Sequence, residues 1–398
     1  MAQQDAMSES PPMAPLSTNK EKGTNGGPLE DDADAHPFFQ YYGQIIHQQN
    51  MLQDTTRTGT YHQAVVQNLP DFKDKVIMDV GTGSGILAMF AANAGAKRVY
   101  AVEASDIADS AEKLVKANGL DHIVKVIRSK VEEVELEEKV DLIISEPMGF
   151  LLVHERMLES FVRARQMFMK PGGKMFPSNG TMFFLPFSDW TIHAEQEQKT
   201  EFWKTKQFYG VDLSVLKDEA TRQIFAQPVV GYIDPAILVA TTEQAASYTI
   251  DFSATTPEKM GDIVVPFQFA VSRTCLVHGI AGWFDVNFVG STATIRLDTG
   301  PFSAPTHWYQ CKLLFAQPMA VNAGQTISGT IHMKANKKYS YDIHVECALD
   351  GTAVFVTADI ALQDQHYHYL SNPAAAETAT SQQSQWGEGN YSNNNHGW

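Results

Sequence analysis

The sequence predicts an α/β protein in which a parallel sheet covered by helices is followed by an antiparallel β-rich domain. Two observations predict it. Up to residue 146, short apolar runs alternate with helical segments, a pattern typical of a parallel sheet covered on both faces. After residue 177, strand-like runs follow one another with Gly, Pro and Asn between them, which indicates a sandwich or barrel.

The first half of the chain contains four apolar runs of strand length. Strands are therefore expected at 75–80, 98–103, 123–129 and 140–146. Helical spacing of apolar residues predicts helices at 36–54, 85–95 and 107–119, the second of them closed by Gly95. This order of elements predicts a Rossmann-like domain over residues 36–177.

The second half has the texture of an antiparallel domain, expected over residues 178–363. Strands are predicted at 181–187, 246–254, 275–290, 292–299, 325–335 and 341–351. A helical insertion at 188–228 interrupts them and carries aromatic residues of the kind found at surfaces. Such an insertion serves either as an arm that binds a partner or as a helix packed on its own domain.

Composition excludes several classes of protein. The 398-residue chain has a formal net charge of -16, which argues against binding nucleic acid through a broad basic face. Its three cysteines lack any CxxC spacing, so neither a disulfide framework nor a metal site is expected. No leader and no apolar run of membrane-spanning length is apparent. The segments 1–35 and 364–398 are polar and poor in bulky apolar residues, and we expect most of both to be disordered.

A glycine-rich turn follows the first predicted strand. DVGTGSG (79–85) opens a helix, but Ile86 occupies the position of the third glycine in a dinucleotide fingerprint. The GxGxG form resembles the first motif of class I methyltransferases, which bind S-adenosylmethionine. Glu103 ends the next strand, 22 residues after Gly81, where an acid would hold ribose hydroxyls. The alternative is a tight structural turn with a coincidental acid.

Two glutamates flank a mostly apolar stretch in SEPMGFLLVHERM (145–157). Eight residues separate Glu146 from Glu155. Unpaired carboxylates in such surroundings are costly, so a cation should account for them. An arginine guanidinium fits, because it stays charged and its fork of N–H donors matches two carboxylates. Held asymmetrically, the carboxylates would draw positive charge toward some nitrogens and leave another free to attack a methyl group.

SEPMGFLLVHERM resembles the double-glutamate loop of the protein arginine N-methyltransferase family. THW (306–308), RTGTY (57–61) and VYAVEAS (99–105) resemble further motifs of that family, and the likeness runs from about residue 36 to residue 351. It is strongest to the coactivator-associated branch of type I. This resemblance implies a class I methyltransferase domain, a β-barrel and a dimerisation arm at 188–228.

The resemblance also implies roles for individual residues in catalysis. Glu146 and Glu155 would clamp the target guanidinium, His307 would pair with Asp54 beneath the site, and Tyr42 would close over it. Met51 matches enzymes that make asymmetric dimethylarginine, and Met148 lies in the glutamate loop near the substrate. Taken alone, Met51 fits core packing, His307 an ordinary buried histidine, and Asp54 a surface charge.

A second set of residues is implied to bind S-adenosylmethionine. Arg57 would pair with its carboxylate, with Gln48 nearby, while Gly81 and Gly83 line the methionine part. Glu103 would hold the ribose, and Glu132 would lie at the adenine with Ser160 close by. Without the resemblance, Arg57 fits a surface cation. The chain departs from the family pattern at Phe38, Phe150 and Thr55, which puts peptide preference and closure of the site in doubt.

These observations predict a type I protein arginine methyltransferase. The resemblance implies a homodimer in the nucleus and cytoplasm, acting on histones and on RNA-binding and transcription proteins, with no direct contact to nucleic acid or membrane. Two alternatives stay open: a scaffold that binds the cofactor and partners without catalysis, and a small-molecule methyltransferase.

Overall fold

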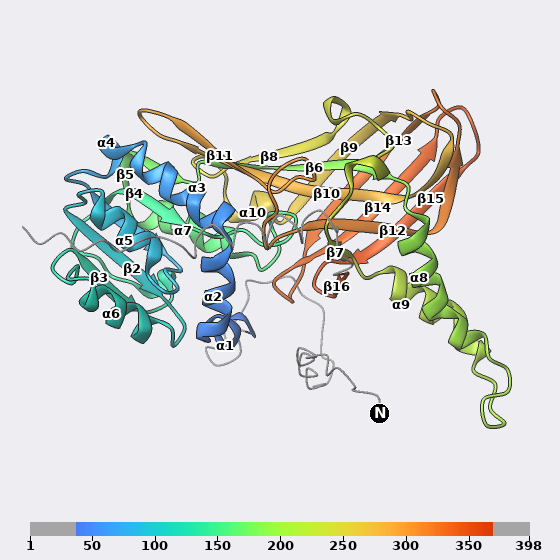
Figure 1. Cartoon of the computed structure of the whole chain (residues 1–398), viewed down its shortest axis with the longest axis horizontal. Helices are drawn as coiled ribbons and strands as arrows, with labels where there is room; N and C mark the ends of the chain where they lie inside the picture. Colours follow the sequence, from blue (N-terminus) through green and yellow to red (C-terminus); the bar gives the residue numbers. More distant parts are fainter. Residues whose placement is uncertain (1–36, 369–398) are drawn as a thin grey trace, which may run out of the picture. The chain divides into compact units, whose positions relative to one another are not determined.

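Five parallel strands form the first sheet, in the order β3-β2-β1-β4-β5 (Figure 1). They are β1 (Val76–Val80), β2 (Arg98–Glu103), β3 (Val124–Arg128), β4 (Val140–Ser145) and β5 (Met169–Phe176). The computed structural model describes residues 37–368, so the tail expected at 1–35 and residues 369–398 of the tail expected at 364–398 lie outside the described residues. Strand order reverses at β1, and in open parallel sheets ligands bind at the carboxyl ends of the strands beside such a point.

Helices surround this sheet and precede it. They are α1 (Pro37–Tyr42), α2 (Ile45–Gln53), α3 (Thr55–Val66), α4 (Leu69–Phe72), α5 (Ile86–Asn93), α6 (Ala108–Ala117) and α7 (Met157–Phe168). Gly85 precedes α5 with φ 85°, a left-handed conformation that glycine adopts without strain. Asp54 caps α3 by accepting a hydrogen bond from the Arg57 amide. No helix within residues 37–368 is long and apolar enough to cross a membrane.

The second domain consists of two further sheets. One has the order β16-β7-β12-β10-β6-β8 with β11 paired to β10, and the other has the order β15-β14-β13-β9. Their strands are β6 (Asn179–Phe187), β7 (Val229–Gly231), β8 (Ala246–Asp251), β9 (Asp262–Ala270), β10 (Cys275–Val289), β11 (Thr294–Asp298), β12 (Gln310–Val321), β13 (Thr326–Ala335), β14 (Tyr341–Leu349), β15 (Phe355–Ala361) and β16 (His366–Tyr367). Contacts of β12 with β15 and of β8 with β9 join the two sheets.

The structure contains strands that the sequence patterns did not single out: β5, β7, β9, β12, β15 and β16. The last of these lies beyond residue 363, where the barrel was expected to end. It pairs in parallel with β7, in an otherwise antiparallel domain. Burial alternates strictly along β9, as in a strand with one face in the core. The sequence analysis did not recognise this alternation.

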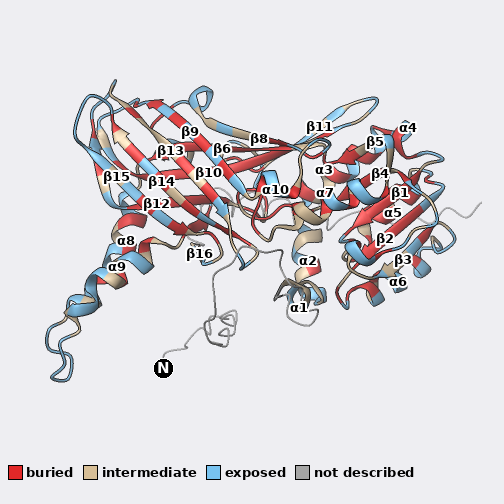
Figure 2. Cartoon of the chain, turned by 180° about the vertical axis from the view of Figure 1, so that it is seen from behind, coloured by how far each residue is buried: buried red, intermediate tan, exposed pale blue. Residues whose placement is uncertain are grey.

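The helical insertion contains α8 (Trp190–Glu201) and α9 (Lys217–Phe225). Its root packs on its own domain, since Ile192 and Phe225 are buried. The segment between the helices exposes apolar side chains, Tyr209 at 94% and Val215 at 80% (Figure 2). The root of the insertion is therefore a helix pair packed on its own domain, while partner binding by its exposed apolar end stays a prediction.

The α3–α4 corner and the β10–β11 turn are joined by hydrogen bonds that Asn68 and Asp71 accept. Asn68 is fully buried and accepts from the amides of Thr292 (3.0 Å) and Ala293 (2.8 Å). Asp71 accepts from the amide and hydroxyl of Ser291. Gly290 allows this approach, because a Cβ there would lie 2.0 Å from Asn68 Cγ.

We predict that Asn68→Ala lowers the free energy of unfolding by about 1 to 3 kcal/mol, because the amides of Thr292 and Ala293 lose the buried side-chain oxygen that accepts from them. Urea unfolding followed by circular dichroism measures this. Asn118→Ala, on the exposed end of α6, is the matched control and should change stability far less. Equal effects of the two substitutions would contradict the structural role of Asn68.

Candidate active site

The loop between β4 and α7 carries both predicted glutamates, and its backbone is strained at and around Glu155. Leu151, Leu152, Glu155 and Arg156 all have positive φ, between 49° and 71°. Such conformations are rare for these residue types and concentrate at functional sites. Gly149 is required here too, because a Cβ would lie 2.2 Å from the carbonyl oxygen of His154. The loop thus turns back on itself within a few residues.

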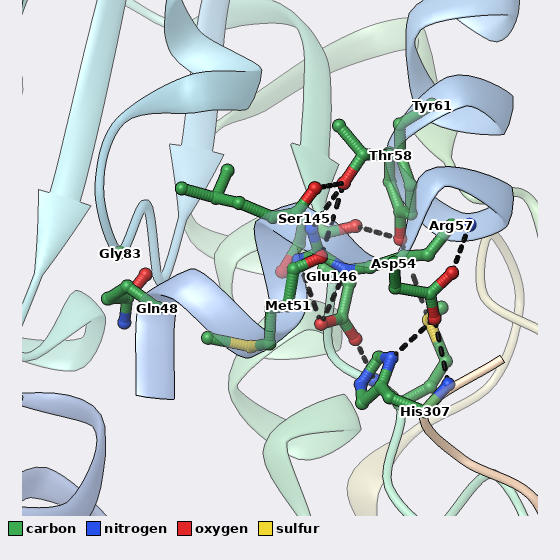
Figure 3. Close-up of polar contacts among 12 residues, drawn as sticks. Gln48, Met51, Asp54, Arg57, Thr58, Tyr61, Gly83, Ser145, Glu146 and His307 are labelled. Atoms are coloured by element: carbon green, nitrogen blue, oxygen red, sulfur yellow. Dashed lines mark hydrogen bonds and ion pairs between the residues drawn. The ribbon is translucent and has the colours of Figure 1, made fainter. Parts of the chain in front are cut away.

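Glu146 holds a guanidinium from within the chain. Arg57 donates to Oε2 of Glu146 from Nη2 (3.0 Å) and from Nε (3.3 Å), as Figure 3 shows. Both side chains are largely buried, with 6% and 10% of their surface exposed. The Met148 amide donates to the other carboxylate oxygen, Oε1 (3.3 Å). Glu146 is therefore placed to accept from a planar fork of donors.

Glu155 faces the N-terminal helices. The Tyr42 hydroxyl lies 2.9 Å from its Oε1 and 3.0 Å from its Oε2. Burial raises the pKa of Glu155 to about 8, and the nearby charge of Glu146 adds to the rise, while the hydrogen bond from Tyr42 opposes it. Burial, followed by the charges of the two glutamates, also raises the pKa of Tyr42 well above its ordinary value. The charge of Glu146 disfavours a second negative charge on Glu155, so an incoming cation between them would favour the ionised form of Glu155.

His307 and Asp54 meet beneath these glutamates, as the resemblance implied. Asp54 Oδ2 lies 2.8 Å from His307 Nδ1 and accepts from the His307 amide at 2.8 Å. Burial alone would raise the pKa of Asp54, but hydrogen bonds from His307 and Arg57 lower it below its ordinary value. Next to this pair, Trp308 Nε1 donates to the Met148 carbonyl at 2.9 Å. The THW segment thus joins the β domain to both α3 and the glutamate loop.

The glycine loop and Glu103 lie together at the carboxyl ends of β1 and β2. Glu103 is buried and accepts from the amides of Gly83 (2.8 Å) and Ser105 (2.9 Å). Gln48 Oε1 accepts from the Ser84 amide at 3.1 Å. A Cβ on Gly81 would lie 2.2 Å from Met157 Cε.

These residues fit S-adenosylmethionine. A side chain at Gly81 or Gly83 would collide with Met157 or Gln48, so the loop keeps its backbone bare, and the Glu103 carboxylate lies where ribose hydroxyls would bind. Among the described residues, the buried Ser105 hydroxyl has no hydrogen-bond partner, which leaves it available to a ligand.

Glu132 and Ser160 also come together, 28 residues apart in sequence. The Ser160 hydroxyl donates to Glu132 Oε1 at 2.7 Å. Gln48 and Met51, three residues apart on α2, share one face of that helix. Glu132 and Ser160 are therefore side by side as the resemblance implied, while the roles of all four residues stay predictions.

Arg57 has a partner within the chain, because its guanidinium lies on Glu146. Its implied pairing with the cofactor carboxylate stays a prediction. The sequence analysis passed over Tyr61 of the RTGTY motif, which is fully buried and donates to the Ser145 carbonyl at 2.8 Å. A tyrosine in a recognised motif was the available signal. Within residues 37–368, no group of three or more His, Cys, Asp or Glu side chains is arranged to hold a metal ion.

Fold and site define a class of protein. A parallel sheet of order 3-2-1-4-5, with a glycine loop after β1 and an acid after β2, is the arrangement of a Rossmann-like methyltransferase, here joined to an antiparallel β domain. Two family models match accordingly. The arginine methyltransferase oligomerization subdomain covers residues 178–352, and the ribosomal protein L11 methyltransferase (PrmA) model covers residues 58–178.

Relatives agree with the family models. The chain is 42% identical over 354 residues to the histone-arginine methyltransferase CARMER of Drosophila willistoni, covering 89% of this chain and 66% of that protein. It thus spans just under two thirds of the length of this relative, and the same holds for CARMER of Drosophila ananassae.

Solved structures agree as well. Protein arginine methyltransferase 10 of Arabidopsis thaliana is similar with a TM-score of 0.75 and 33% identity, over 81% of this chain and 100% of that one. The Trypanosoma brucei PRMT1 enzyme–prozyme heterotetrameric complex with AdoHcy gives 0.73 and 31%, over 81% and 99%. The chain belongs to the protein arginine methyltransferase family.

The raised pKa of Glu155 has a consequence for stability. A carboxyl whose pKa rises on folding, here from 4.5 to about 8, holds its proton more tightly in the folded state, so stability falls as pH rises through that interval. We predict that Glu155→Gln is more stable than wild type without cofactor, by a margin that grows from pH ~5 to pH ~8. Thermal unfolding across this range measures it. Glu112→Gln on the exposed face of α6 is the control, and a constant margin for Glu155→Gln would contradict the assignment.

Proposed function

We propose that this chain is a type I protein arginine methyltransferase that uses S-adenosylmethionine. The observation that carries the proposal is the pair of glutamates on one strained loop, with a guanidinium already bound to Glu146 at 3.0 Å. A site that binds the guanidinium of Arg57 in this way has the chemistry to bind that of a substrate.

Chain residues that fit the cofactor surround the carboxyl ends of β1 and β2. Those proposed to hold it are Gln48, Arg57, Gly81, Gly83, Glu103, Glu132 and Ser160. Bound there, S-adenosylmethionine supplies an electrophilic methyl group on a sulfonium. In its proposed role Arg57 pairs with the carboxylate of S-adenosylmethionine instead of with Glu146. Glu146 is then free to bind the guanidinium of the substrate.

The glutamates act by position and charge. Glu146 and Glu155 accept hydrogen bonds from different nitrogens of the target guanidinium, which fixes its plane and draws positive charge toward those nitrogens. Tyr42 orients Glu155 through its hydroxyl, at 2.9 Å from Oε1. The His307–Asp54 pair fixes the start of α3 and with it Arg57. The remaining nitrogen would then take up the methyl group. An N–CH3 bond would form as the S–CH3 bond breaks, the sulfonium would leave as a neutral thioether, and one N–H proton would pass to a carboxylate of the pair.

Product, substrates and location follow from the family and its named relatives. Met51, on α2 beside Gln48, supports asymmetric rather than symmetric dimethylarginine as the product. The relatives named histone-arginine methyltransferase support histones as substrates and action in the nucleus. RNA-binding and transcription proteins as substrates, and a cytoplasmic share, are further parts of the proposal.

We predict that wild-type protein with labelled S-adenosylmethionine yields mono- and asymmetric dimethylarginine on arginine-containing histone peptides. Glu155→Gln should bind cofactor like wild type by calorimetry but lose about 99% of the transfer rate, because one of two carboxylate partners is gone. Hydrolysis followed by chromatography of the labelled amino acids separates the products.

Other outcomes would redirect the proposal. Symmetric dimethylarginine would contradict the role of Met51. Cofactor binding without any methylarginine would favour a scaffold, and transfer to small molecules alone would favour the other alternative. Glu112→Gln serves as the control for loss of a carboxylate outside the site.

A homodimer is proposed from the insertion at 188–228. Its exposed Tyr209, Val211 and Val215 form an apolar surface, and the matching family model is described as an oligomerization subdomain. Burial of these side chains against a second copy would remove the cost of exposing them.

We predict that deletion of residues 188–228 gives a monomer with little methyl transfer. The double substitution Tyr209→Ser with Val215→Asp should do the same while leaving the packed root intact. Analytical ultracentrifugation measures the association state, and Val354→Asp in the exposed β14–β15 connection is the control. A fully active monomer would refute the link between arm and activity.

A further inference from the structure

The two faces of the short C-terminal strand β16 contact different parts of the molecule. Gln365 and Tyr367 point toward the glutamate loop: Gln365 Nε2 lies 2.9 Å from His154 Nε2, and the Tyr367 ring is 6.0 Å from that of Phe150. The residues between and after them point the other way, because side chains alternate along a strand. Strand β16 thus lies between the glutamate loop and a second element on its other side.

That other element is α8, the root of the arm. His366 Nε2 lies 3.1 Å from Lys199 Nζ, and His368 Nε2 lies 3.0 Å from Glu195 Oε2. The backbone of β16 is fixed as well, by pairing with β7 and by the His368 amide donating to the Val230 carbonyl. Strand β16 is therefore anchored on the side away from the loop.

His154 receives the contact from β16 and immediately precedes Glu155. It is 6% exposed, and its Nδ1 lies 2.8 Å from the Ser340 hydroxyl. Because the Gln365 amide nitrogen can only donate, His154 Nε2 accepts and Nδ1–H donates to Ser340. Burial lowers the pKa of His154 to about 4, in keeping with this neutral form. Its ring is stacked on Phe150.

The other neighbour of Glu155 is held in a similar way. Arg156 Nη1 donates to the Asn336 carbonyl at 2.8 Å, in the same β13–β14 connection that carries Ser340. Both residues next to Glu155 are thus tied to the β domain, while Glu155 itself points to Tyr42. Since its φ of 71° is unfavourable, these ties have to maintain the conformation.

We propose that β16 acts as a strap on the active-site loop, with His154 as a positioning residue that Gln365 and Ser340 hold so that Glu155 faces its substrate. The inference rests on the proposed function for the role of Glu155. Since the strap is anchored on α8, it also connects the root of the arm to the glutamate loop.

The test is Gln365→Met in the full chain, which keeps the size of the side chain but cannot donate to His154. Gln268→Met on the exposed face of β9 is the matched control. Hydrogen exchange over residues 147–156 reports the loop without reference to activity. We expect exchange there to become about tenfold faster than in the control and kcat on an arginine peptide to fall about tenfold. Cofactor affinity by calorimetry should stay unchanged.

A pH profile separates positioning from general loss of structure. Wild-type kcat/KM should rise with pH up to about 8, as Glu155 ionises between Glu146 and Tyr42. A loosened loop admits water and lowers the pKa of Glu155, so the acid limb of Gln365→Met should move to lower pH. The positioning role would be overturned if the acid limb of the Gln365→Met profile stayed where it is in wild type and the loss of kcat equalled the fraction of protein that is unfolded.

Two further outcomes are decisive. Exchange and kcat equal to those of the control would overturn the strap. If Gln365→Met destabilises the whole chain, His154→Phe decides by the same measurements, because it keeps the stacked ring and removes both hydrogen bonds. Inactive wild type on every peptide would count against the proposed function, while loop exchange would still decide the strap.

Discussion

Two carboxylates brought together in a partly buried site repel each other. The surrounding structure therefore has to compensate both of them. Glu146 is compensated by the charge of Arg57, and Glu155 by the Tyr42 hydroxyl. Backbone strain at Glu155 and its neighbours adds to the cost. Contacts from the N-terminal helices and from the β domain offset this repulsion and strain. The site therefore needs residues from both halves of the chain.

Much of the parallel half could be predicted, because β1 to β4 are short apolar runs and α-helices follow β1, β2 and β4 in the chain. Among the missed strands, β5, β9 and β12 contain Pro171, Pro266 and Pro318, residues that lower any strand prediction. The structure accommodates them. β9 is an edge strand, where a missing N–H costs little, and the pairing of β12 with β10 shifts register between Leu314 and Met319, a stretch that contains Pro318. The sequence alone does not say where an edge or a bulge will fall.

The candidate site was predictable as a set of residues, and less so as a set of contacts. The pairs His307–Asp54 and Glu132–Ser160 lie as the resemblance implied. The position of Arg57 on Glu146 could not be foreseen, since spacing does not tell which carboxylate a cation will meet. His154 was missed because its partners, Ser340 and Gln365, are 186 and 211 residues away. Only the fold reveals that it is held from both sides.

The buried junction of Asn68 and Asp71 with the turn at 290–293 has a consequence for the history of the chain. Amide acceptors on one domain match backbone donors on the other, and Gly290 admits no larger side chain without moving Asn68. Neither surface can change alone, so substitutions there must arise together or be eliminated. The two domains are therefore inherited as one piece, and chimeras made by exchanging the β domain between relatives need the α3–α4 corner to be exchanged with it.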